Sequence, residues 1–186
     1  NHNLDAVLRN RMTDKEQEQY DAYNKYYGNR DYLFDLNSIP TGGAGFGYDI
    51  PAEALSDPQF AKMIREAEKY LGYPYVWGGA SPDTSFDCSG FVSYVFTNSA
   101  VYNTGRLGAT SLYGICQKIT ADEARPGDLI FFEGTMGEDV GGITHVGLYV
   151  GDNMMIHCGN PITYADLTRS YWQQHFYGFG RIPYDP

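Results

Sequence analysis

The stretch Phe86-Asp87-Cys88-Ser89-Gly90-Phe91-Val92 places a cysteine where a turn becomes an apolar helix. After Cys88 the apolar residues recur at the spacing of a helix with one buried face, and they are Phe91, Val92, Val95 and Phe96. Cys88 should lie in the first turn, where free backbone N–H groups and the helix dipole favour a thiolate. Asp87 should cap this helix, with its carboxylate turned toward the N–H groups. A lone cysteine is more often a small core residue, so Cys88 is a candidate nucleophile only if it has partners.

Length and composition predict one folded domain with an extension, because 186 residues with 42% hydrophobic content can bury one good core. The segment 1–52 is the expected extension. It is polar at first, with a capping box at Thr13 and Glu16 that predicts a helix near 14–27, and it ends in a linker rich in Gly and Pro over 37–51. The folded domain is predicted to cover 53–186.

Charge and cysteine content exclude several classes of protein. A net charge of −10 disfavours nucleic acid or an anionic membrane as a partner. No apolar run is long enough to span a membrane, so no membrane contact is expected in this chain. Three irregularly spaced cysteines do not form a disulfide framework. The chain begins with Asn1 rather than Met, which suggests a fragment from which an upstream signal or anchor has been removed.

The elements flanking the cysteine can be predicted in part. Pro58 begins an amphipathic helix, capped by Ser56 or Asp57, that should run to Leu71. The segment 73–79 contains Pro74 and two glycines, so it should be a loop or short strand. Its Tyr75 could cap the core or bring a hydroxyl to the cysteine. The segment 98–125 has no clear pattern; its Arg106 could be a solvated side chain or an anchor for a substrate carboxylate. The apolar run 129–132 is typical of a central strand.

A second group of chemical residues lies on a predicted hairpin. The segment 144–150 alternates, with Val146, Leu148 and Val150 on the core face and His145 on the other. If 151–153 forms a three-residue loop, Val150 pairs with Met154, Val146 with Cys158 and Gly147 with His157. That register brings His145 and His157 together on the non-core face. A two-residue loop would instead put the two histidines on opposite faces.

One cysteine and two histidines fit two kinds of site. They could be three zinc ligands, but the ligands lack the short spacings typical of zinc sites. Alternatively, Cys88 attacks a carbonyl group, His145 takes and returns the proton, and His157 orients the imidazole of His145. The second arrangement is acyl-transfer chemistry, and it is the one we favour.

Five motifs resemble, in order, those of the NlpC/P60 cell-wall peptidases: 75–79 (YVWGG), 87–90 (DCSG), 126–129 (PGDL), 145–149 (HVGLY) and 155–157 (MIH). The resemblance covers about 57–183. It implies an α+β, permuted papain-like fold, with the cysteine helix packed on an antiparallel sheet. It also implies a triad of Cys88, His145 and His157 without metal or cofactor, and a tyrosine, Tyr75, beside the nucleophile. The implied substrate is the peptidoglycan stem peptide, cut between γ-D-glutamate and diaminopimelate or lysine.

From this resemblance we expect a monomeric cysteine endopeptidase, secreted or tethered at the bacterial cell wall, similar to the branch of the family carried by Gram-positive conjugative elements. The remaining substrate-binding residues should be Trp77, Asp87, Ser89 and Arg106. Cys158 departs from the small residue common in the family after the third triad member, and no SH3-like wall-binding domain is visible. Two alternatives stay open: an N-acetylmuramoyl-L-alanine amidase with the same triad, and a catalytically silent wall-binding module.

Overall fold

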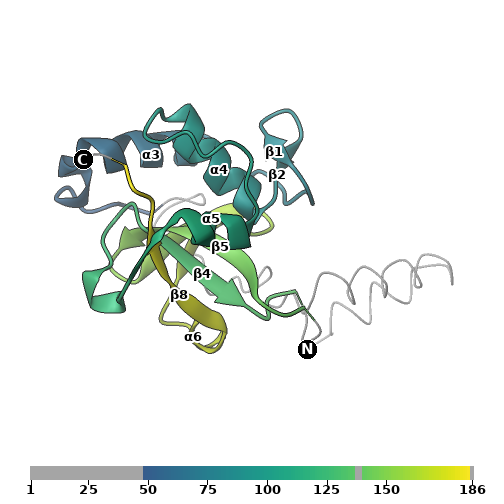
Figure 1. Cartoon of the computed structure of the whole chain (residues 1–186). Coiled ribbons are helices and arrows are strands. Elements are labelled where there is room, and N and C mark those ends of the chain that lie inside the picture. Colours follow the sequence, from purple (N-terminus) through teal and green to yellow (C-terminus); the bar gives the residue numbers. More distant parts are fainter. Residues whose placement is uncertain (1–47, 137–139, 185–186) are drawn as a thin grey trace, which may run out of the picture.

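The computed structural model describes residues 48–136 and 140–184. The predicted helix near 14–27 and nearly all of the predicted linker lie outside these residues. In the described part, a six-stranded antiparallel sheet with the order β3-β8-β4-β5-β6-β7 carries helices on both faces (Figure 1). This is the α+β arrangement predicted for the nucleophile helix and its sheet.

The described residues form six helical elements, the six strands of the main sheet and a small hairpin. The helical elements are η2 (Ala54–Ser56), α3 (Pro58–Glu68), α4 (Cys88–Asn98), α5 (Ala109–Ile115), η3 (Ala121–Glu123) and α6 (Ser170–His175). The six strands of the main sheet are β3 (Gln117–Ile119), β4 (Leu129–Glu133), β5 (Ile143–Gly151), β6 (Met154–Cys158), β7 (Ile162–Asp166) and β8 (Phe176–Arg181). Two further strands, β1 (Ala80–Ser81) and β2 (Ser85–Phe86), form a small hairpin just before α4.

Helix α3 begins as predicted and ends earlier. The carboxylate of Asp57 caps it by accepting from the backbone N–H groups of Gln59 and Phe60, with Pro58 at the first helical position. The predicted extension to Leu71 is wrong, because the chain tightens after Glu68: the N–H of Leu71 donates to the carbonyl of Glu68, three residues back.

The larger hydrophobic core lies between helices α3 and α4 and one face of the sheet. Its helical part includes the residues predicted from their spacing, Phe60, Met63, Ile64, Phe91, Val92, Val95 and Phe96. From the sheet it receives Val146, Leu148, Val150, Ile156 and Cys158, as the alternation predicted. Tyr48 and Ile50 also pack against this core from the start of the described residues.

The β5–β6 hairpin has the predicted register, but its loop differs from the predicted one. Leu148 pairs with Ile156 and Tyr149 with Met155, which is the register expected from the sequence. The predicted three-residue loop and the Val150–Met154 pair are wrong, because Gly151 pairs with Met154 and the loop has only two residues, both with positive φ. Between Tyr149 and Gly151 the register shifts, and Val150 forms a bulge without a partner on β6. This extra residue compensates for the shorter loop. The two histidines therefore still share a face.

The other face of the sheet carries a second, smaller core. It consists of Ile130, Phe132, Met155, Ala165, Leu167, Trp172 and Phe179. His145 and His157 lie on this face and are only 2% and 3% exposed. The face that the sequence presented as non-core is thus buried, because α6 covers part of it with the indole of Trp172.

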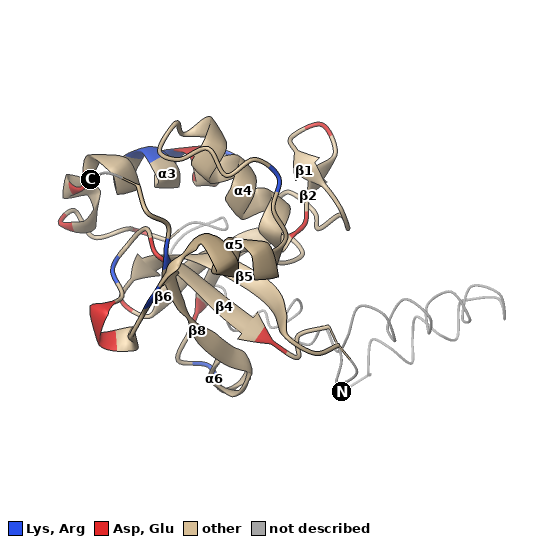
Figure 2. Cartoon of the chain, in the orientation of Figure 1, with Lys and Arg blue, Asp and Glu red and all other residues tan. Residues whose placement is uncertain are grey.

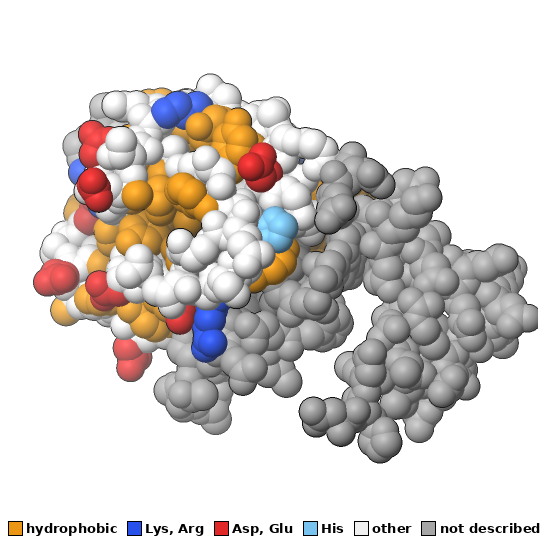
Figure 3. Space-filling view, turned by 90° about the horizontal axis from the view of Figure 1, so that it is seen from below, with side chains coloured by type: hydrophobic (Ala, Val, Ile, Leu, Met, Phe, Trp, Pro, Cys, Tyr) orange, Lys and Arg blue, Asp and Glu red, His pale blue; other side chains and the backbone are white. Residues whose placement is uncertain are grey.

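Surface chemistry is mixed. Lys and Arg are interspersed with Asp and Glu along the ribbon (Figure 2). The face seen from below shows hydrophobic side chains at the surface (Figure 3), and Phe176 and Tyr177 at the start of β8 are among the exposed large hydrophobic residues. Among the described residues, no helix is both long and apolar enough to cross a membrane.

Candidate active site

The start of α4 holds Cys88 as the sequence predicted. Asp87 is the N-cap, and its Oδ1 accepts hydrogen bonds from the backbone N–H of Gly90 at 2.7 Å and from the Ser89 hydroxyl at 3.1 Å. A Cβ at Gly90 would clash with the carbonyl oxygen of Gly79, so a glycine is needed where the loop crosses the helix. The DCSG motif therefore combines a cap, a candidate nucleophile and a close approach of two backbones.

Arg106, which lies in the segment between α4 and α5, contacts the cap of α4. Its Nη2 lies 2.6 Å from Oδ2 of Asp87, and its Nη1 donates to the Ser89 hydroxyl at 3.0 Å. The same Asp87 oxygen accepts from the N–H of Gly78 at 3.0 Å. Three of the four predicted substrate-binding residues are thus brought together in one network. All of these contacts lie within the protein, and the Arg106 side chain remains 39% exposed.

The Cys88 sulfur lies against strand β5. Its S–H points to the carbonyl oxygen of Thr144 at 4.0 Å, one residue before His145. The helix start was expected to favour the thiolate, but burial outweighs it. Burial and the charge of Asp87 together raise the pKa of Cys88 to about 12. The Arg106 charge and backbone hydrogen bonds lower this pKa by less. The prediction of an intrinsically acidic thiol is therefore wrong for the resting site, because desolvation outweighs the helix start.

The two histidines form a direct pair. Nε2 of His145 lies 3.0 Å from Nδ1 of His157, and the two rings are nearly perpendicular. Gly147 makes room for this pair, because a Cβ there would lie 3.3 Å from the Cβ of His157 and 2.6 Å from Sδ of Met155. Burial lowers the pKa of His145 to about 3 and also lowers the pKa of His157. Both imidazoles are thus neutral at pH 7 in the resting site.

Aromatic side chains enclose the histidine pair. The indole of Trp172 stacks on the ring of His145, with centroids 5.7 Å apart and planes 26° apart. The same indole meets His157 edge to face at 5.1 Å. Trp172 was missed from the sequence, because the helix that carries it has only six residues and no apolar period. The only feature of the sequence that could have drawn attention to Trp172 is the adjacent aromatic pair Tyr171 and Trp172, which follows a buried strand.

Tyr75 and Trp77 lie in the loop beside α4. Tyr75 forms a single bridge with Phe86 and donates its N–H to the side chain of Asn160 at 3.1 Å, which fixes the backbone of the loop. Its ring is half-buried against the larger core. Trp77 is 59% exposed, the most exposed of the large hydrophobic residues described. The loop therefore presents an indole to solvent, two residues after a partly buried tyrosine.

Comparison with known proteins places this site in a family. The NlpC/P60 family model matches residues 72–181, a range that contains Cys88, both histidines, Tyr75 and Arg106. The chain belongs to the NlpC/P60 family.

Named relatives and solved structures agree with this assignment. The chain is 43% identical over 124 residues to the bifunctional muramidase/DL-endopeptidase CwlT of Bacillus subtilis, covering 66% of this chain and 36% of that protein. It is 38% identical over 163 residues to the murein DD-endopeptidase MepH of Escherichia coli, covering 85% and 57%. A crystal structure of an NLP/P60-family protein similar to lipoprotein from Staphylococcus aureus superimposes with a TM-score of 0.65 at 39% identity, covering 78% of this chain and 46% of that one. This chain thus spans only about a third to a little over half of the two curated relatives.

The NlpC/P60 domain holds its three cysteines as buried free thiols. Cys158 is fully buried in the larger core, as its register predicted, and its S–H donates to the carbonyl oxygen of Phe86 at 3.2 Å. Cys116 is 7% exposed, close to the 6% of Cys88, and burial raises its pKa to about 12 as well. Burial alone therefore does not set the candidate nucleophile Cys88 apart from Cys116. Among the described residues, no three His, Cys, Asp or Glu side chains are grouped in a way that could hold a metal ion.

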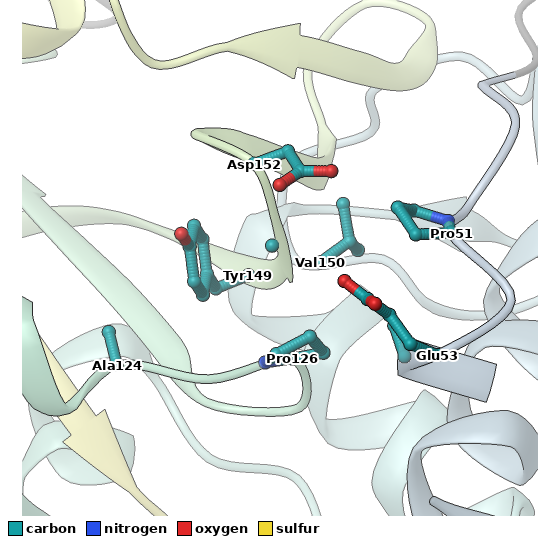
Figure 4. Close-up of a pocket in the computed structure, with 9 residues that line it drawn as sticks. Pro51, Glu53, Ala124, Pro126, Tyr149, Val150 and Asp152 are labelled. Atoms are coloured by element: carbon teal, nitrogen blue, oxygen red, sulfur yellow. The ribbon is translucent and has the colours of Figure 1, made fainter. Parts of the chain in front are cut away.

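A pocket of about 370 Å³ lies elsewhere on the domain, at the turn end of β5 (Figure 4). Tyr149 and Asp152 line it from the hairpin, Glu53 and Pro51 from the segment before α3, and Pro126 from the turn before β4. Tyr149 is four residues along an extended strand from His145, about 13 Å away. This pocket contains none of the residues proposed for catalysis.

Proposed function

We propose that this domain is a cysteine endopeptidase of peptidoglycan that cuts stem peptides between γ-D-glutamate and the diamino acid, diaminopimelate or lysine. One observation carries the proposal. The sulfur of Cys88, at a helix start, lies against the carbonyl of Thr144 in β5, and the residue after Thr144 is His145, which is hydrogen-bonded to His157. The name of CwlT, a DL-endopeptidase in part, supports this choice of bond.

Cys88 is the proposed nucleophile and His145 the proposed base. Nε2 of His145 is engaged by His157, so Nδ1 is the nitrogen we assign to the thiol. His145 Nδ1 takes the thiol proton while the sulfur attacks the γ-carbonyl carbon of D-glutamate, giving a tetrahedral oxyanion. The imidazolium then protonates the departing amine of the diamino acid, and the C–N bond breaks to leave a thioester. Water, deprotonated by the same imidazole, hydrolyses the thioester and regenerates the thiol.

His157 is the proposed orienting residue, and its protonation follows from this chemistry. A base that accepts at Nδ1 must carry its own proton on Nε2, so His145 donates to Nδ1 of His157. His157 then holds its proton on Nε2. Because both rings are neutral at rest, the thiol loses its proton as the substrate is attacked, rather than in a standing ion pair.

The other predicted site residues have proposed roles at the cleft. Arg106 and Ser89 hold the Asp87 cap, and we propose that the exposed side of the guanidinium also receives the free carboxylate of the substrate. Trp77 provides an exposed aromatic surface for the stem peptide. Tyr75 is proposed to act beside the nucleophile, as the resemblance implies.

The test is digestion of a defined tetrapeptide, L-Ala–γ-D-Glu–diamino acid–D-Ala, and of intact muropeptides, read by mass spectrometry. We expect the dipeptide L-Ala–γ-D-Glu as a product. Release of whole stems from the glycan would indicate an amidase instead. Cleavage of cross-links between D-amino acids, the bond class in the name of MepH, would change the proposed bond. Sedimentation with purified walls without any cleavage would indicate a binding module.

A second buried cysteine in the chain provides a matched control for the proposed nucleophile. Cys88→Ala should abolish cleavage, and Cys116→Ala, at almost the same exposure, should not. EDTA should have no effect. Loss of activity on chelation that zinc restores would replace the proposed triad with a metal hydrolase.

The proposed setting is outside the cell, secreted or tethered at the wall, where the substrate of the wall-hydrolase relatives lies. We also propose that the domain acts as a monomer, and that the full protein belongs with the conjugative-element branch of the family. Light scattering of the purified chain tests the first of these two points.

A further inference from the structure

The proposed mechanism requires a positive charge in an apolar place. His145 becomes an imidazolium when it takes the thiol proton, yet it is 2% exposed and lies beside the second core. Its hydrogen-bonded neighbour, His157, is neutral and supplies no negative charge to stabilise the imidazolium. A group that favours the charged ring over the neutral ring is therefore needed close to His145.

Trp172 has the geometry for this role. Its ring plane is 26° from that of His145, with the centroids 5.7 Å apart, so the negative face of the indole lies over the imidazole. A cation within about 6 Å of an indole centroid is attracted by the ring quadrupole, more strongly when both are desolvated. Trp172 is itself only 3% exposed.

The indole is also held in place. Phe132 on β4 contacts it with ring centroids 4.7 Å apart, and Tyr171 meets it edge to face at 5.1 Å. The edge-to-face contact with His157 at 5.1 Å lets the same side chain limit rotation of both imidazoles. A rigid indole can therefore set the ring plane of the base as well as its charge.

We propose that Trp172 is a positioning residue of the site: it fixes the ring of His145 and stabilises its protonated form through the stacked indole face. The proposal rests on the proposed function, because it assumes that His145 is the base for Cys88. It assigns catalytic importance to α6, an element outside the helix and hairpin that carry the triad.

The experiment measures alkylation of Cys88 by iodoacetamide as a function of pH, which requires no peptidoglycan. In Trp172→Leu we expect the rate at pH 7 to fall about tenfold, and the deficit to shrink at high pH, where the thiol ionises without help from His145. Trp172→Phe keeps an aromatic face and should lose only about threefold. Phe179→Leu is the matched control, because Phe179 lies in the same second core and contacts Tyr149 and Phe176.

A purely structural role gives a different result. If Trp172→Leu lowers the melting temperature but alkylates with the wild-type pH profile, or if Phe179→Leu shifts the profile equally, the proposal is wrong. Should Trp172→Leu fail to fold, an unchanged profile in Trp172→Phe overturns it. His145→Ala separates the two proposals. If His145→Ala alkylates like the wild type, the triad fails; if alkylation depends on both His145 and Trp172 while stem peptides stay uncut, only the proposed substrate fails.

Discussion

The two faces of the central sheet hold the two halves of the proposed chemistry in different surroundings. Cys88, the proposed nucleophile, belongs to the larger core, where the long helices α3 and α4 with regular apolar spacing pack on β5 and β6. The histidine pair lies on the opposite face, where one short helix supplies Trp172. Strand β5 connects the two, because Thr144 and His145 are consecutive. Alternation thus places the histidine pair on one face of β5, while the Cys88 sulfur meets the backbone of the same strand one residue before His145.

After loss of Cys88 itself, the largest effect should come from removing the proposed base on the smaller face. We expect His145→Ala to lower turnover by about 10⁴-fold, because proton transfer is lost. His157→Ala should lower it by only about 10- to 100-fold, since His145 remains and loses only its orientation. Steady-state cleavage of a stem peptide, with circular dichroism to confirm folding, measures both. Equal complete losses together with unfolding would mean that both rings are structural.

On the larger face, the corresponding variant is Arg106→Ala. The Asp87 side chain is only 9% exposed, and without Arg106 its charge would raise the Cys88 pKa further. We expect turnover to fall about 10- to 100-fold, with partial recovery in Arg106→Lys, which keeps the charge but not the forked contact to Asp87 and Ser89. Wild-type turnover in Arg106→Ala would show that the cap needs no counter-charge.

The buried histidines should also make stability depend on pH. Because the folded pKa of His145 lies near 3, below the ordinary value of 6.5, the unfolded chain binds more protons between these values. The free energy of unfolding should therefore fall as the pH drops below about 6.5, by up to about 1.4 kcal/mol per pH unit for this residue. Urea titrations at pH 7 and pH 5 should show a smaller difference in His145→Asn.

In the larger core, Cys158→Ser should cost about 1 kcal/mol. The structure gives the S–H an acceptor, the carbonyl of Phe86 at 3.2 Å, so a serine hydroxyl would also find a partner. Chemical denaturation of Cys158→Ser beside Cys158→Ala measures the value of that hydrogen bond. A cost above about 3 kcal/mol would mean that the hydroxyl does not reach Phe86.

The smallest effect is expected on the other face, at Thr163. This residue pairs with His157, and its hydroxyl oxygen is buried without a hydrogen-bond partner among the described residues. Thr163→Val removes that hydroxyl at constant shape, so stability should be unchanged or rise by up to about 1 kcal/mol. A clear loss of stability or turnover would reveal a bridging contact from this hydroxyl to the histidine pair.

The sequence predicted the larger face well and the smaller face poorly, for physical reasons. Apolar spacing and caps specify α3 and α4 locally, so Asp57 and Asp87 could be recognised as caps from their positions in the chain alone. Alternation specified which side chains of β5 enter the core. Trp172 and Arg106 act across the chain: Arg106 reaches Asp87 from 19 residues away, and Trp172 reaches His145 from a helix of six residues. No local period encodes such contacts.

Because of the bulge at Val150, the number of residues between the two histidines decides whether they share a face of the sheet. His145 and His157 share a face only because one unpaired residue makes up for a loop of two. Removing or adding a single residue between the histidines would exchange the inside and outside of one strand, so that an imidazole would enter the larger core. Changes of two residues would preserve the pair. During divergence, this segment should therefore accept insertions and deletions in even steps, and an odd step should survive only where a bulge is gained or lost with it.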